Sequence, residues 1–245
     1  MLILLPPSET KRPGGVGVSI EKAAIIWAAL EPTRIKLYEA LIGISRDPAL
    51  AAKALGLGKK NLADAEANLE LLSAPTMPAL QRYTGVLYDA LDFNSLTEAD
   101  LKQADQKLFI QSALFGLVPA IQQIPYYRLS AGSKLPGINL RKLWIEAHAE
   151  VWPRMIGPIL DMRSKAYVEI NPIPAGRDAK FVEVLDEDSG KALNHFNKKA
   201  KGAFVRAALK NKLESFDQLP QVAKAAGLRS EVTADQVLLF VPKGF

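Results

Sequence analysis

The stretch from residue 47 to residue 72 has the residue types and spacing of a phosphate-binding turn. Gly56 and Gly58 stand between two stretches whose apolar residues recur at helical spacing. Glycines permit a tight hairpin, and the backbone N–H groups of the hairpin and of the next helix start can bind an anion. Lys59 and Lys60 follow directly and add positive charge. The pattern predicts a helix-hairpin-helix that holds nucleic-acid phosphates without reading bases. The alternative is an ordinary helix pair closed by a glycine C-cap.

A second cationic feature is the stretch from Asn197 to Lys212, which contains six lysine and arginine residues and no acid. Such a run is usual on the solvated face of a helix, and an unopposed run is also suited to face phosphates. We therefore expect a basic helix over about 198–213. In a DNA-binding protein this helix and the hairpin lysines would supply the charge, with contributions from Lys198, Lys199, Lys201 and Arg206.

A different chemistry, that of an enzyme, is indicated by polar residues near the ends of apolar segments. Ser8 and Lys11 have the Ser-x-x-Lys spacing of some acyl-transfer enzymes, but a proline and two glycines follow and argue against the helix that this chemistry needs. We interpret the segment as a polar loop at the C-terminal end of a strand, where α/β proteins commonly build sites. An enzyme of unknown reaction would use a pocket near Lys11, Arg128, Ser164 and Tyr167.

Arg128 follows two tyrosines in an irregular segment. A guanidinium beside aromatic rings can stack on a base or bind a phosphate, and it can equally anchor a loop through backbone carbonyls. We expect Arg128 to be at least partly buried and bonded to backbone carbonyls or a carboxylate. His148 falls inside a helical pattern and is expected to be a partly buried, hydrogen-bonded residue.

Composition limits the remaining classes. The 245-residue chain has no cysteine and two histidines, so it can form neither a thiolate metal site nor a histidine-rich one. We expect no metal and no cofactor. A net charge of +5 permits a polyanionic partner without requiring one. The sequence contains no recognisable secretory signal and no apolar run of membrane-spanning length, so a soluble, cytoplasmic protein without membrane contact is expected.

Apolar segments near both ends of the chain enclose a mostly helical middle. Strands are predicted at 2–5, 167–170, 181–185 and 237–241, and 108–115 is a strand or a buried helical turn. Helices are predicted at 19–30, from Pro32 to about 42, at 140–160 with a break at Pro153, and at 216–226. These elements predict one α/β domain over 1–245. Its mixed sheet would join the N- and C-terminal strands, with many helices between them and an inserted helix-hairpin-helix lobe at about 45–74.

Several segments share an order and a spacing along the whole chain. They are Met1–Leu4 with Pro7 and Thr10, Tyr83–Leu91, Leu114–Leu117 leading to Pro125–Leu129 and Gly132, Leu143-Trp144, and Lys198–Gly202 with Arg206. Together they resemble the YaaA-like peroxide stress family. The chain departs from the family pattern at Glu9, where lysine is common, at Pro119, where arginine is expected, and at Asp161–Tyr167. The chain therefore resembles a divergent branch.

The resemblance implies a single α/β body, DNA binding through a helix-hairpin-helix and a basic cleft, and a role in limiting peroxide damage linked to intracellular iron. The partner expected on these grounds is the DNA backbone, with no base specificity. Composition and spacing do not supply the iron link, which comes from the resemblance alone.

Overall fold

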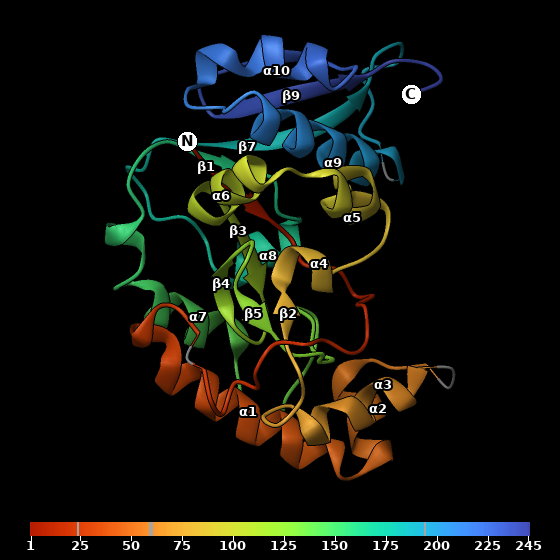
Figure 1. Cartoon of the computed structure of the whole chain (residues 1–245), viewed down its shortest axis with the longest axis vertical. Helices are drawn as coiled ribbons and strands as arrows, with labels where there is room; N and C mark the ends of the chain where they lie inside the picture. The colour runs from red at the N-terminus through yellow and green to blue at the C-terminus, as the bar shows by residue number, and fades with distance from the viewer. Residues whose placement is uncertain (24, 59–60, 194) are drawn as a thin grey trace.

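The computed structural model describes residues 1–23, 25–58, 61–193 and 195–245 (Figure 1). In these residues one sheet has seven strands in the order β4-β3-β1-β6-β7-β9-β8. The middle five run parallel, and β4 and β8 close the two edges antiparallel. The strands are β1 (Leu2–Leu5), β3 (Leu108–Ser112), β4 (Gly116–Pro119), β6 (Ile159–Asp161), β7 (Ala179–Asp186), β8 (Arg229–Val232) and β9 (Gln236–Val241). The predicted mixed sheet that joins both ends of the chain is confirmed.

The centre of the sheet is buried on both faces. Every residue of β1, β3, β4 and β6 is buried, which explains why their sequences are mainly apolar and do not alternate between apolar and polar residues. β7 lies further out, and its fully buried residues alternate at Val182 and Val184. A separate two-stranded ribbon pairs β2 (Met77–Pro78) with β5 (Gln123–Ile124).

The helices surround this sheet. α9 packs on β7 and β9, α10 packs on β8, and α6 packs on β3 and β4. Figure 1 shows α9 and α10 at the upper end and α1, α2, α3 and α7 at the lower end. The α-helices are α1 (Glu31–Ser45), α2 (Pro48–Leu55), α3 (Ala63–Glu66), α4 (Ala79–Arg82), α5 (Val86–Leu91), α6 (Glu98–Lys107), α7 (Leu140–His148), α8 (Lys165–Ile170), α9 (His195–Lys210) and α10 (Leu219–Ala225). Short 3₁₀ turns are η1 (Ala28–Leu30), η3 (Ala67–Glu70), η4 (Phe93–Ser95), η5 (Trp152–Arg154) and η6 (Phe216–Gln218).

α9 and α5 approach each other closely at Gly202. A Cβ atom at this position would overlap the backbone oxygen of Leu87 and would lie 2.9 Å from the Cβ of Ala90. The absence of a side chain therefore sets how near the basic helix lies to α5.

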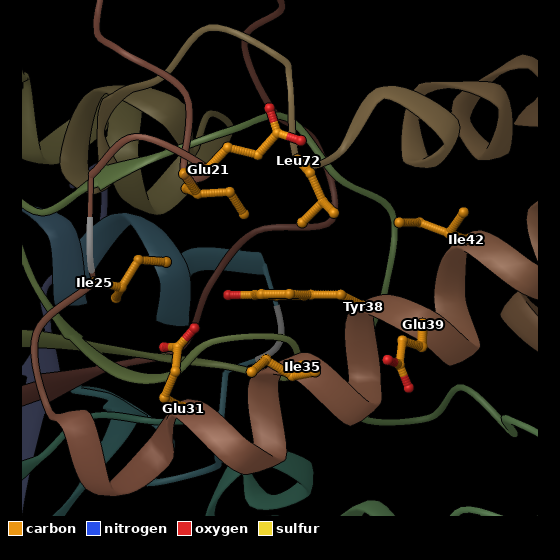
Figure 2. Close-up of a pocket in the computed structure, with 9 residues that line it drawn as sticks. Glu21, Ile25, Glu31, Ile35, Tyr38, Glu39, Ile42 and Leu72 are labelled. Carbon is orange, nitrogen blue, oxygen red and sulfur yellow. The ribbon is translucent and has the colours of Figure 1, made fainter.

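α1 begins at Glu31, one residue before Pro32, where the sequence predicts the start of the second helix. Pro32 lies in the first turn of α1, where a backbone N–H would have no partner within the helix. In the described part of 19–30 the structure has only the 3₁₀ turn η1 and no α-helix. The prediction for 19–30 is therefore wrong. Part of α1 remains uncovered and forms one wall of a groove (Figure 2).

The region from 140 to 170 differs from the predicted long helix followed by a strand. α7 ends at His148, a 3₁₀ turn carries Pro153, and the chain then enters β6. The predicted strand at 167–170 is the helix α8, because Tyr167 and Ile170, one turn apart, are both buried on one face of it. The segment 167–170 has the composition of a strand, but this packing makes it a helix.

His148 lies fully buried at the end of α7. Its Nδ1 lies 2.8 Å from the carbonyl oxygen of Trp144, and its Nε2 accepts a hydrogen bond from the N–H of Leu117 at 3.2 Å. The Nδ1–H tautomer satisfies both contacts. Burial lowers the pKa of His148 from 6.5 to about 3, so it is neutral at neutral pH. The predicted hydrogen-bonded histidine is confirmed, and it is more deeply buried than expected.

Candidate functional site at the carboxyl edge of the sheet

The carboxyl ends of β1, β3 and β6 meet at one edge of the sheet, because these strands are adjacent and parallel. Open α/β sheets usually bind ligands outside this edge. A cavity of about 380 Å³ opens beside it. Its wall combines the loop after β1, the start of α5, the start of α8 and one residue of α9; the lining residues are 6–10, 84–88, Ser164, Tyr167 and Lys198.

Two hydroxyl groups of the loop after β1 form part of the cavity wall. Ser8 Oγ and Thr10 Oγ1 lie 3.2 Å apart, and Thr10 Oγ1 donates to the carbonyl of Thr84 at 3.3 Å. Gly85 has φ +95°, and a Cβ there would lie 3.3 Å from Thr10 Oγ1. The turn before α5 and the loop after β1 thus approach closely, which leaves the hydroxyls beside the open space.

Arg82 holds the far side of the same loop. Its guanidinium is fully buried and donates to the carbonyl oxygens of Arg12 at 2.5 Å, Gly14 at 2.8 Å, Pro75 at 3.2 Å and Ile124 at 3.1 Å. These bonds attach the glycine-rich part of the loop to the β2–β5 ribbon. The sequence analysis did not identify Arg82, since a buried arginine cannot be told from an exposed one by its neighbours in sequence.

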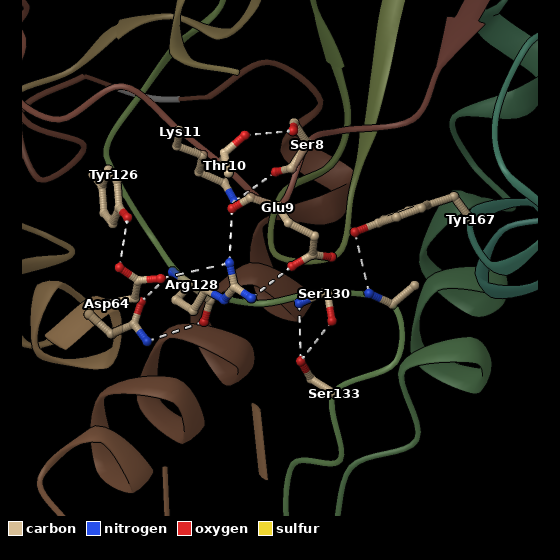
Figure 3. A network of polar contacts seen from close by, with 12 residues as sticks. Ser8, Glu9, Thr10, Lys11, Asp64, Tyr126, Arg128, Ser130, Ser133 and Tyr167 are labelled. Carbon is tan, nitrogen blue, oxygen red and sulfur yellow. Dashed lines mark hydrogen bonds and ion pairs between the residues drawn. The ribbon is translucent and has the colours of Figure 1, made fainter. Parts of the chain in front are cut away.

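Arg128 anchors the other side of the loop (Figure 3). Its Nη1 donates to the Glu9 carbonyl at 3.0 Å, its Nη2 pairs with Glu9 Oε2 at 3.1 Å, and Asp64 Oδ2 lies 3.9 Å from Nη1. Asn68 binds the backbone N–H and carbonyl of Arg128 at 2.7 and 3.2 Å. The side chain of Arg128 is 14% exposed. The prediction of a partly buried arginine bonded to a carbonyl and a carboxylate is confirmed.

Lys11 lies inside the loop rather than on its surface. Its Nζ donates to the carbonyl oxygens of Ser8 at 3.0 Å and Glu9 at 3.4 Å, and lies 4.5 Å from the ring centroid of Tyr127 and 5.6 Å from that of Tyr83. Burial lowers the pKa of Lys11 from 10.5 to about 7, with a nearby Glu9 opposing the change. The Ser-x-x-Lys spacing therefore brings the amine to the Ser8 backbone.

A chain of hydroxyls runs inward from Lys11. Tyr83 and Tyr127 share a hydrogen bond of 2.8 Å, and Tyr127 and Ser112 share another of 2.8 Å. Ser112, the last residue of β3, accepts from the backbone N–H of Leu114 at 3.0 Å. Burial raises the pKa of both tyrosines well above 10, so the chain is protonated and uncharged. Sequence reasoning missed Ser112, which only the strand register brings to Tyr127.

A buried ion pair lies beneath the end of β6. Arg163 binds Asp161 through two nitrogens, Nε to Oδ1 at 2.8 Å and Nη2 to Oδ2 at 2.7 Å, and donates to the Asn171 carbonyl at 2.7 Å. A further charge comes from Lys201, whose Nζ donates to the Met162 carbonyl at 3.1 Å. Burial lowers the pKa of Lys201 from 10.5 to about 8. This side chain is buried and faces the sheet, which argues against the predicted contact of Lys201 with DNA.

Ser164 directly precedes α8, and Tyr167 lies in the first turn of that helix. The hydroxyl of Tyr167 accepts from the N–H of Ala131 at 3.3 Å. Both line the cavity, whereas Lys11 and Arg128 are absent from its described lining and contact the Glu9 carbonyl instead. The structure thus gathers the four predicted residues around one loop, two on the cavity side and two behind it.

The other residues of the basic helix point in different directions. Lys198 lines the cavity and Lys199 is exposed, with its Nζ 4.9 Å from the ring centroid of Phe245. Arg206 is partly exposed and pairs with Asp92 at 3.4 Å. The predicted helix is confirmed, and Lys198 is a member that lines the cavity.

The glycine hairpin differs in detail from a pair of regular helices. Gly56 ends α2 with φ +66°, and both its N–H and that of Leu57 donate to the Ala52 carbonyl, as in a glycine C-cap. The second helix is the four-residue α3 followed by the 3₁₀ turn η3. A helix-hairpin-helix lobe is not confirmed. Lys59 and Lys60 lie outside the described residues.

Across the described ranges 1–23, 25–58, 61–193 and 195–245, no three His, Asp or Glu side chains are grouped so as to hold a metal ion. In the same ranges no helix has the length and apolar character needed to cross a bilayer.

The sheet, the cavity and the anchored loop define an α/β protein with a polar site at the carboxyl edge of a mixed sheet. The chain belongs to the family described as peroxide stress protein YaaA, whose sequence model matches residues 1–232. UPF0246 protein CE1889 of Corynebacterium efficiens is 38% identical over 239 residues, which cover 95% of each chain. UPF0246 protein SCO2297 of Streptomyces coelicolor is 39% identical over 216 residues, 85% of this chain and 83% of the relative. Uncharacterized protein Cj0984 of Campylobacter jejuni is 29% identical over 225 residues and 89% of each chain. The resemblance drawn from the sequence motifs is confirmed.

Proposed function

We propose that this peroxide stress protein binds the DNA backbone without base specificity. The observation that carries the proposal is the acid-free cationic run of α9, from which Lys198 reaches the rim of an open cavity and Lys199 faces solvent. Cations that make no ion pair within the described part of the chain remain available to phosphates, and neither lysine makes one there. The hairpin with Gly56, Gly58, Lys59 and Lys60 is a second proposed contact.

The test is a salt titration of duplex binding. Each lost phosphate contact reduces the slope of log affinity against log salt by about 0.9, so a double substitution, Lys198→Ala with Lys199→Ala, should reduce it by about two. The matched control is Lys36→Ala with Lys142→Ala, two exposed lysines on α1 and α7 at the other end of the molecule (Figure 1). Two unrelated duplexes should behave alike, because backbone contacts carry no base code.

The hairpin is tested separately. Lys59→Ala with Lys60→Ala should also reduce the slope, and Gly58→Val should hinder close backbone approach. If the protein fails to bind duplex DNA, or if neither lysine pair changes the slope, the proposal is refuted.

The cellular role that we propose with this binding is protection against peroxide damage that depends on iron. Cells lacking the protein should be more sensitive to hydrogen peroxide, and a cell-permeable iron chelator should remove the difference. Complementation with the Lys198→Ala, Lys199→Ala variant would then measure whether protection needs the basic helix. Sensitivity that persists unchanged in the presence of chelator would contradict the iron link.

A second candidate function is that of an enzyme acting on a small molecule in the cavity beside Lys11, Arg128, Ser164 and Tyr167. The observation that favours it is Lys11, a buried amine whose pKa of about 7 leaves a substantial neutral fraction at neutral pH. Such an amine is suited to act as a base or a nucleophile. Labelling with acetic anhydride at pH 7, read by peptide mass spectrometry, should modify Lys11 when the loop opens. Lys11→Met should leave DNA affinity unchanged, which separates the two functions.

A further inference from the structure

A groove of about 280 Å³ runs along α1 and shares no described lining residue with the cavity at the carboxyl edge of the sheet (Figure 2). Its wall and floor are mainly aliphatic. Ile35 and Ile42, seven residues apart on α1, lie along one side, and Leu72 faces them across the space. Ile35 is 48% exposed, although its neighbours on the groove are apolar. An apolar channel of this size fits one small organic ligand.

The hydroxyl of Tyr38 is the polar group inside this groove. Tyr38 is 7% exposed, and its ring is fixed edge-on against Phe115 at a centroid distance of 6.0 Å. Figure 2 shows the hydroxyl directed into the space between Glu21 and Glu31. It makes no hydrogen bond to any residue that the structure describes. The hydroxyl oxygen stays open to the groove, so a ligand there can donate a hydrogen bond to it.

The charged groups around the groove are acidic. Glu21, Glu31 and Glu39 line it, and its lining contains no lysine or arginine among the described residues. Arg34 lies behind Glu31, with Nη1 3.4 Å from Glu31 Oε2, and its other bonds go to buried carbonyls. Glu21 and Glu39 have no ion-pair partner in the described part of the chain, so the groove favours a cation despite the net positive charge of the protein.

We propose that the groove binds a primary aliphatic amine. The ammonium group donates a hydrogen bond to the Tyr38 hydroxyl and lies near the carboxylates of Glu21 and Glu31. The methylene chain lies against Ile35, Ile42 and Leu72. This combination requires both a charge and an apolar tail of several carbons, and it is independent of the DNA-binding proposal.

The test uses hexylamine as the probe and the full chain with ¹³C-labelled isoleucine methyl groups. We expect hexylamine to shift the methyl resonances of Ile35 and Ile42 in a saturable manner. Hexan-1-ol and hexanoate have the same tail without the positive charge and should bind at least about tenfold more weakly. Binding by all three at the same concentration would overturn the proposal, as would the absence of saturable shifts with hexylamine.

Two substitutions locate the ammonium group. Tyr38→Phe keeps the ring and removes the hydroxyl, and it should weaken hexylamine binding about tenfold. Glu21→Gln should weaken it by about threefold, since an exposed ion pair contributes less. The matched controls are Tyr126→Phe and Glu146→Gln, which lie outside the groove and should leave affinity unchanged. An unchanged affinity in Tyr38→Phe would refute the assigned contact.

A third substitution keeps the test independent of Tyr38 packing. Ile35→Lys changes a half-exposed residue and places a cation in the groove, so it should abolish hexylamine binding while the unfolding temperature stays close to that of the wild type. Retained binding in Ile35→Lys would move the ligand out of the groove and overturn the proposal.

Discussion

The burial of Lys11 makes the stability of the protein depend on pH in a way that one substitution can isolate. The pKa of Lys11 is about 7 in the folded chain and 10.5 in an exposed lysine. Between these values the unfolded chain holds a proton that the folded chain has released. The free energy of unfolding therefore rises with pH across this window. Below pH 7 Lys11 is protonated in the folded chain as well, and the cost of burying its charge lowers the free energy of unfolding by the full amount.

The size of the effect follows from the two pKa values. Each pH unit inside the window contributes about 1.4 kcal/mol, and the contribution is smaller close to pH 7, where folded Lys11 is still partly protonated. Lys11 should therefore add about 2 kcal/mol to the free energy of unfolding between pH 7 and pH 9. This range stays below the ordinary tyrosine pKa of about 10, so tyrosine ionisation does not interfere.

The assay is urea unfolding of the wild type and of Lys11→Met at pH 7, 8 and 9. Lys201 contributes its own pH dependence to both proteins, so the difference between their profiles reports Lys11 alone. Lys36→Met, at an exposed position of α1, is the matched control and should follow the wild type. If the profiles of the wild type and Lys11→Met are parallel, Lys11 is not buried as a largely neutral amine and the reasoning fails.

Three further predictions concern packing, anchoring and acid stability. Gly202→Ala should lower the free energy of unfolding by about 1–3 kcal/mol, because its methyl group overlaps the Leu87 carbonyl, whereas Gly132→Ala, which has open space, should not. Arg128→Lys should lower it by about 1 kcal/mol despite the conserved charge, because a lysine lacks the planar fork with which Arg128 binds the Glu9 carbonyl and carboxylate; equal urea midpoints would make Arg128 a simple surface charge. From pH 7 to pH 5 the wild type should lose about 2 kcal/mol through His148, which takes up a proton only on unfolding, and His148→Gln should lack this loss.

The sequence alone was sufficient for the features that depend on local pattern. The continuous apolar run at 2–5 predicts a strand buried on both faces, and the apolar segment 108–115 predicts a strand or a buried helical turn; residues 2–5 and 108–112 are strands of the sheet centre. The irregular Tyr-Tyr-Arg segment predicts an anchored guanidinium, and Arg128 is anchored to Glu9. The order of motifs along the chain also identifies the family, because a family pattern is itself a property of sequence.

Only the tertiary structure decided which charges face solvent. Lys198, Lys199 and Lys201 are near neighbours in a basic run, but the rotation of α9 about its axis directs Lys201 to the Met162 carbonyl and Lys198 to the cavity. Lys11 is likewise drawn inward by packing against Tyr127. Charge patterning cannot distinguish these cases, since burial depends on contacts between residues far apart in the chain.

The same limit applies to secondary structure and to the hairpin. The composition at 167–170 favours a strand, yet this segment is a helix, because a helix buries Tyr167 and Ile170 on one face. At Gly56 the sequence allows either free N–H donors or a C-cap, and the folded chain uses the cap. Local pattern thus located the strands at 2–5, 181–185 and 237–241 and the turn at Gly56, whereas long-range packing determined which backbone groups and charges remain available to a ligand.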